Sequence, residues 1–120
     1  MNKYADIIES ILIERENQNV KHPVLPKYFL HPVNDPKKED LERAANYAKA
    51  DNDKLEHDGD HSWYGIHREE LYETHAETRP ISEMTTEDLH KMRAEAIQCA
   101  ALYVRMIETI DGMIKEKEDA

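Results

Sequence analysis

The chain has 120 residues, the length of one ordinary domain, with 39% hydrophobic residues, 35% charged residues and a net charge of -10. Such an acidic chain lacks the basic surface needed to bind a nucleic-acid backbone, although a nucleotide remains a suitable ligand if a divalent cation neutralises the site. The single cysteine, Cys99, excludes an intramolecular disulfide, and no apolar run approaches the roughly 20 residues of a membrane span.

The first predicted element is an amphipathic helix over residues 3–17. The residues at its start, MNKYADIIES, contain no apolar signal-peptide core, so we expect a cytoplasmic protein. The following segment, 17–35, is rich in proline, which disfavours helix both at its own position and at the residue before it. We therefore predict an ordered, extended loop there. The apolar positions that define the helix are Tyr4, Ile7, Ile8, Ile11 and Leu12.

Three further helices are predicted, over 36–53, 63–77 and 86–116. Asp35-Pro36 is a favourable start for the first of them, and Ser62 can cap the second. Thr85 to Asp88 offers a cap with acidic residues for the last, whose apolar positions recur every three or four residues. Residues 115–120 form a polar tail that we expect to fray. The sequence thus predicts a single all-α domain, 1–120, built as a four-helix bundle.

The helix predicted over 63–77 carries a stripe that begins apolar and becomes acidic. Trp63, Ile66, Glu70, Glu73 and Glu77 share this stripe, while Glu69 lies to one side of it. Glu70 and Glu73 therefore point where a core is expected, and a buried carboxylate costs several kcal/mol unless it is paired or coordinated.

The last helix offers a counterpart, because Glu95 and Gln98 are three residues apart. Two facing helices would present Glu70, Glu73, Glu95 and the Gln98 amide oxygen to one volume, and such oxygens suit Mg²⁺ or Mn²⁺. The alternative is a solvated acidic face, since Glu-x-x-Glu is common in helices. The ion-pair partners available to such a face are Arg68, Arg93 and Arg105.

Three segments resemble a family of phage and bacterial MazG-like proteins. "IIESILIERENQNVKH" resembles their N-terminal "ERxRQxxKWG" helix, and "SWYGIHREELYE" is similar to "TWxxILxEEVxE". "MRAEAIQCAALYVRMIETID" is similar to "LRAELVQVAAVAVAWIEAID" and is the most specific of the three. Together the segments cover most of the chain in the order found in the family.

This resemblance implies an all-α nucleotide pyrophosphohydrolase that cleaves nucleoside triphosphates to monophosphate and pyrophosphate with Mg²⁺. The metal ligands of the family match this chain at Glu70, Glu73 and Glu95, whereas Gln98 replaces the expected Asp. His22-Pro23 likewise replaces the expected Trp-Gly. An amide oxygen can coordinate Mg²⁺ but adds no charge, so the site would hold one metal and would hold two less well.

In an enzyme of this kind Glu69 or Glu73 would be the base for the attacking water. Phosphate contacts would come from cationic side chains, and an aromatic ring would stack on the base, although a surface ion pair and a core anchor are the more common fates of such residues. The residues in question are Lys21, Arg93 and Arg105 for phosphate and Trp63 or Tyr64 for the base.

Three functional hypotheses remain open. The first is the pyrophosphohydrolase, the second a catalytically weak or inactive protein that binds and sequesters a nucleotide or nucleotide-derived signal, and the third a helical scaffold with a solvated acidic face. The apolar face of the last helix is too long for one small monomer to cover, so we expect a homodimer or homotetramer. The segment from His57 to His67, rich in His and Asp, is either a transition-metal site or a polar loop.

Overall fold

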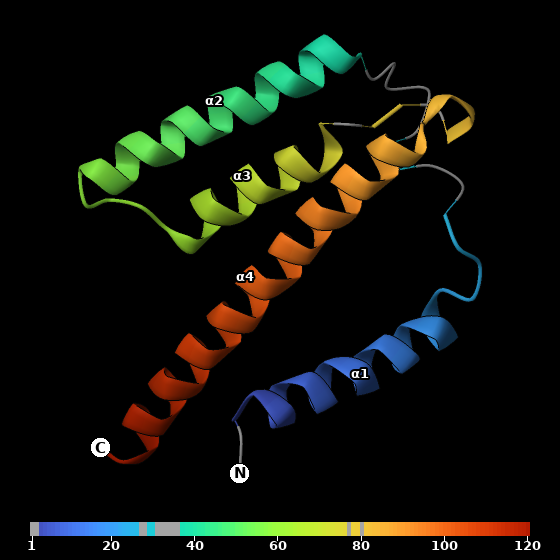
Figure 1. Cartoon of the computed structure of the whole chain (residues 1–120). Helices are drawn as coiled ribbons and strands as arrows, with labels where there is room; N and C mark the ends of the chain where they lie inside the picture. Colours follow the sequence, from blue (N-terminus) through green and yellow to red (C-terminus); the bar gives the residue numbers. More distant parts are fainter. Residues whose placement is uncertain (1–2, 27–28, 31–36, 77, 80) are drawn as a thin grey trace. The chain divides into compact units, whose positions relative to one another are not determined.

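The computed structural model describes residues 3–26, 29–30, 37–76, 78–79 and 81–120. Within these ranges it contains four α-helices, a short 3-10 helix and no strand, which confirms the predicted all-α class (Figure 1). None of the described helices combines the length and hydrophobicity required to cross a membrane. The elements are α1 (Lys3–Lys21), α2 (Lys38–His57), α3 (Trp63–His75), η2 (Ile81–Glu83) and α4 (Thr86–Glu118).

The chain forms two compact units. One contains residues 1–27 and 107–120, and therefore α1 with the end of α4. The other contains residues 28–106, and therefore α2, α3 and most of α4. All the acidic residues of the candidate site belong to this second unit.

Helix α1 is longer than predicted, because it continues through Lys21 instead of ending near residue 17. The first proline after it is Pro23, and His22 still donates its backbone N–H to Gln18 at 2.8 Å. The helix therefore ends two residues before Pro23, and helix is disfavoured both at a proline and at the residue before it. The remainder of the predicted loop is non-helical at residues 22–26 and 29–30, and its other residues lie outside the described part of the chain.

Helix α2 begins at Lys38 with Lys37 as its N-cap residue, and Asp35-Pro36, which we had expected to start it, lies outside the described residues. The helix runs four residues past the predicted end at 53, to His57. It ends in a Schellman motif: the Asp60 N–H donates to the Leu55 carbonyl at 2.8 Å, and Gly59 has a φ of 78°. Gly59 is the residue that allows this left-handed turn.

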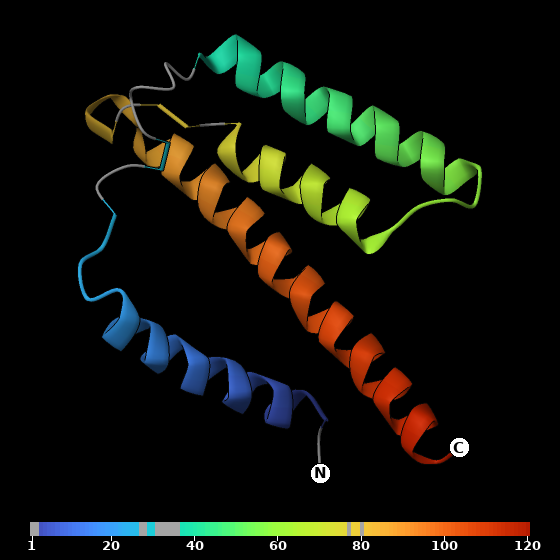
Figure 2. The ribbon, with the colours of Figure 1, turned by 180° about the vertical axis from the view of Figure 1, so that it is seen from behind.

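Helices α2 and α3 lie side by side and run in opposite directions (Figure 1; Figure 2). Small residues make this close approach possible, since Ala45 and Ala48 are buried on α2 and Gly65 is buried on α3. A polar contact also joins the pair: Arg68 and Asp51 form an ion pair at 2.5 Å. The packing fixes which side of α3 faces α2.

Ser62 caps α3, as predicted. Its hydroxyl accepts a hydrogen bond from the Gly65 N–H at 3.0 Å, and its backbone is extended. Because an N-cap hydroxyl satisfies a backbone donor that has no partner within the helix, we expect Ser62→Ala to lower the free energy of unfolding by about 1 kcal/mol. Urea titration followed by circular dichroism measures this loss. Ser82→Ala, in the exposed η2 segment, is the control and should change stability little.

Helix α4 begins with a capping box. Thr85 Oγ1 accepts from the Asp88 N–H at 3.1 Å, and Asp88 Oδ2 accepts from the Thr85 N–H at 3.0 Å, which confirms the predicted cap. The helix continues to Glu118, two residues past the predicted end at 116, and the expectation that residues 115–120 fray stays a prediction. This end carries Lys115 and Lys117, whose positive charges favour a helix C-terminus.

Candidate functional site

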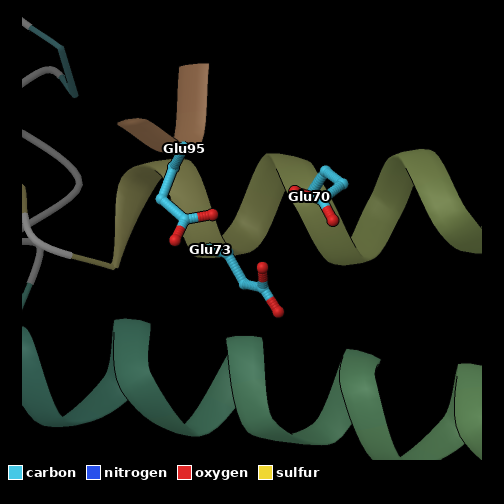
Figure 3. Close-up of side chains that lie close together, drawn as sticks. All are labelled: Glu70, Glu73 and Glu95. Carbon is cyan, nitrogen blue, oxygen red and sulfur yellow. The ribbon is translucent and has the colours of Figure 1, made fainter. Parts of the chain in front are cut away.

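The acidic stripe of α3 meets α4 at three glutamates. Glu70 and Glu73 lie on α3, Glu95 lies on α4, and each offers a carboxylate oxygen within 4.8 Å of those of the other two (Figure 3). Among the described residues, this is the one place where three metal-ligating acidic, histidine or cysteine side chains converge so closely. We call Glu70, Glu73 and Glu95 the acidic triad. It unites three of the four predicted metal ligands.

The triad is electrostatically unfavourable without a cation. Partial burial, together with repulsion from Glu70, Glu69 and Glu95, raises the pKa of Glu73 to about 7. Burial and repulsion from Glu95 and Glu69 also raise the pKa of Glu70. Near neutral pH the metal-free triad therefore retains protons that ordinary glutamates have lost.

Two carboxylate oxygens of the triad lack protein partners. The Oε2 atoms of Glu70 and Glu95 are both buried, and neither has a hydrogen-bond partner among the protein atoms. A buried acceptor left in this way costs free energy that a bound cation would recover. Oxygen atoms from half-buried carboxylates are also the ligands that Mg²⁺ and Mn²⁺ prefer, so the donor set fits such an ion.

Glu69 is held beside the triad by residues of α2. Asn52, which is only 4% exposed, donates from Nδ2 to Glu69 Oε2 at 2.8 Å, and Lys49 Nζ lies 3.9 Å from Glu69 Oε1. The Glu69 side chain is itself only 12% exposed. Sequence reasoning missed Asn52 and Lys49. Asn52 follows Ala45 and Ala48 on one stripe of α2, a pattern that places a polar residue against the neighbouring helix.

Two hollows open on this part of the molecule. One, of about 410 Å³, is lined by Glu73 and Glu95 of the triad and by Lys91. The other, of about 440 Å³, is lined by Trp63, Glu69 and Arg105, among others. We call the second the Trp63 hollow. It brings together three residues that sequence analysis selected separately, one as a base, one as a stacking ring and one as a phosphate contact.

The remaining predicted site residues stay predictions. Gln98 is exposed on α4, three residues after Glu95, and the triad is complete without it. Arg93 is also exposed on α4. Lys21 is the last residue of α1 and belongs to the unit that does not contain the triad.

The histidines between His57 and His67 do not form a comparable cluster. His57 and His61 are exposed, and His67 packs its ring against Tyr103 with a centroid distance of 4.2 Å. Within the described part of the chain, three metal-ligating side chains converge at the acidic triad, and these histidines are not among them. Residues 58–62 of this segment connect α2 to α3, while His57 ends α2 and His67 lies on α3.

Cys99 is half-buried on α4, with Sγ 3.2 Å from Thr74 Oγ1. Thr74 in turn donates to the Glu70 carbonyl at 2.7 Å. The thiol therefore contributes to the contact between α3 and α4 beside the triad.

Comparison of the chain with protein-family models, with curated proteins and with solved structures finds no match.

Proposed function

We propose that this chain is a cytoplasmic, MazG-like nucleotide pyrophosphohydrolase that uses Mg²⁺ or Mn²⁺ to convert (d)NTPs or related nucleotides to monophosphate and pyrophosphate. The observation that carries the proposal is the convergence of Glu70, Glu73 and Glu95, with two buried oxygens that have no protein partner. The resemblance of three segments to MazG-like proteins supports the same assignment.

Each residue then has a definable role. Glu70, Glu73 and Glu95 would hold the cation, which when bound neutralises phosphate charge and lowers the pKa of coordinated water. Asn52 fixes the orientation of Glu69 through its hydrogen bond, so this carboxylate is a positioned acceptor for the proton of an attacking water. Glu73 is the other candidate for that task. Lys91 lines the hollow beside the triad and supplies positive charge near the site of the phosphates.

A second candidate function is nucleotide binding without efficient turnover, as in a sequestering protein. One observation favours it: Gln98 carries an amide where the resemblance implies a carboxylate, which leaves three acidic ligands in the cluster. Three carboxylates suit one divalent cation better than two, and phosphoryl transfer benefits from the full metal charge.

We also propose that the protein acts as a homodimer or homotetramer. Large apolar side chains remain exposed along α4, among them Leu89 at 46%, Ile97 at 51% and Tyr103 at 53%. We propose that a second copy covers these side chains, since large exposed apolar patches are typical of protein interfaces. Size-exclusion chromatography with light scattering at micromolar protein concentration tests this proposal. A mass equal to that of a single chain would contradict it.

One experiment separates enzyme, binder and scaffold. The protein is incubated with a nucleotide panel and Mg²⁺, and both pyrophosphate release and the thermal shift are recorded. The enzyme releases pyrophosphate, and Glu70→Ala should reduce that release at least 100-fold, since it removes a ligand of the cation. Glu70→Gln, which keeps the side-chain shape, checks that the loss does not arise from misfolding.

A thermal shift without pyrophosphate release would instead support the binder. If neither signal appears with any nucleotide, the acidic triad is a surface feature and the proposal is wrong. Glu9→Gln, on exposed α1, serves as the control variant and should behave like the unmodified protein.

A further inference from the structure

The Trp63 hollow has the size and the lining of a site for the uncharged end of a nucleotide. Its volume of about 440 Å³ lies within the usual range for small-molecule sites. Trp63 is half-buried in its wall, so the indole ring combines a fixed position with an accessible surface. Stacking of a base on an aromatic ring contributes about 1–3 kcal/mol.

The charges of the lining argue against phosphate in this hollow. Asp53, Glu56 and Glu69 contribute three carboxylates, against one guanidinium from Arg105. Lys49 partly compensates, since its Nζ lies 3.4 Å from Asp53 Oδ2 and 3.9 Å from Glu69 Oε1. The surroundings remain acidic even when Lys49 is included. Like charges brought together cost several kcal/mol, so a phosphate group is disfavoured and a base is not.

The same carboxylates select among the bases. An ionised carboxylate only accepts hydrogen bonds, and cytosine, adenine and guanine each carry an exocyclic amino group that donates them. Uracil and thymine carry a carbonyl oxygen where cytosine carries its amino group, and this oxygen would face a carboxylate acceptor to acceptor. The donor that remains to them is the ring N3–H.

Glu69 connects this hollow to the acidic triad. It lines the hollow, and its charge acts on both Glu70 and Glu73. Its side chain is held by Asn52, so the acceptor faces a fixed direction instead of adapting to each ligand. A fixed acceptor discriminates more sharply than a mobile one, because it cannot turn away from a wrong partner.

From these contacts we infer that the Trp63 hollow is a base-recognition site that selects nucleotides whose base carries an exocyclic amino group over those of uracil and thymine. The inference rests on the proposed function, because it takes the ligand to be a nucleotide whose phosphates lie at the acidic triad. It adds a substrate class to that function, and it leaves Glu73, the other candidate, as the base for the attacking water, because Glu69 then contacts the nucleobase.

The test compares α,β-methylene CTP with α,β-methylene UTP, which cannot release pyrophosphate and which differ chiefly in an amino group against a carbonyl. Isothermal titration calorimetry with Mg²⁺ should show the CTP analogue binding at least tenfold more tightly. Glu56→Gln combined with Glu69→Gln should bring the ratio close to one, because an amide can donate to the carbonyl of uracil. Glu39→Gln, exposed at the start of α2, should leave the ratio unchanged.

Two further variants test the stacking surface. Trp63→Ala should weaken both analogues about tenfold, and Trp63→Phe, which preserves an aromatic face and the fold, should retain most of the affinity. Equal affinity of the unmodified protein for the two analogues would overturn base selection and leave the proposed function standing. Absence of Mg²⁺-dependent binding of either analogue would overturn both.

Discussion

Replacing Glu73 with glutamine should weaken Mn²⁺ binding by roughly 100-fold, since even the outer partners of metal ligands commonly contribute 10–100-fold to affinity. A carboxylate oxygen of Glu73 lies within 4.8 Å of those of Glu70 and Glu95, so its loss leaves the cation only two carboxylates of the triad. Calorimetric titration with Mn²⁺ at pH 8 measures the loss. Glu9→Gln removes the same charge from the exposed surface of α1 and should leave the affinity unchanged.

The same substitution should stabilise the metal-free protein. The pKa of Glu73 is raised to about 7 from an ordinary value of 4.5, so between these pH values the folded state binds more protons than the unfolded state. Stability contributed by this group therefore falls as pH rises from about 4.5 to about 7. Glutamine does not titrate in this range. The stability that Glu73→Gln gains over the unmodified protein is therefore complete above pH 7 and disappears near pH 4.5.

Thermal denaturation at several pH values measures this second effect. We expect the free energy of unfolding of metal-free Glu73→Gln to exceed that of the unmodified protein by about 1 kcal/mol at pH 8, which allows for solvent screening of a partly exposed group. This difference corresponds to a melting temperature about 4 °C higher. With saturating Mn²⁺ the unmodified protein should become more stable than Glu73→Gln, because the cation stabilises only a folded state that binds it. A Glu73→Gln variant that is less stable than the unmodified protein at pH 8 without metal would contradict the electrostatic interpretation of the triad.

The acidic triad could be predicted because it depends on helical spacing. Glu70 and Glu73 are three residues apart on α3, and their stripe continues from the apolar side of Trp63 and Ile66, so periodicity alone placed them towards a neighbouring helix. Glu95 was proposed as their partner because it lies three residues before Gln98 on the last helix, and the resemblance then matched the same residue. Spacing within one helix does not by itself reveal which other helix it meets.

The contacts made by α2 could not be predicted in the same way. The hydrogen bond from Asn52 to Glu69 joins two helices whose register depends on the turn at Gly59 and on the buried Ala48. Sequence analysis ended α2 at residue 53, without its last turn and the Schellman motif that sets this register. The Trp63 hollow depends on the same register, and its Arg105 comes from a distant position on α4.

Replacing Gln98 with aspartate should raise Mn²⁺ affinity about tenfold and increase pyrophosphate release. Gln98 follows Glu95 by three residues on α4, and residues at this spacing are neighbours on a helix surface. A fourth carboxylate would add charge to a ligand set whose affinity for hard cations depends on its charge count. Calorimetric titration with Mn²⁺ and a pyrophosphate assay measure the two effects.

The control for this gain is Gln18→Asp, which adds the same charge to the exposed face of α1 and should alter neither quantity. The metal-free Gln98→Asp protein should also unfold at a lower temperature at pH 8, because a fourth carboxylate increases the repulsion that already raises the pKa of Glu70 and Glu73. Unchanged Mn²⁺ affinity would show that position 98 does not reach the cation. If the affinity for Mn²⁺ increases and pyrophosphate release does not, nucleotide sequestration is favoured. The charge that Gln98 lacks would then limit binding of the cation but would not limit turnover.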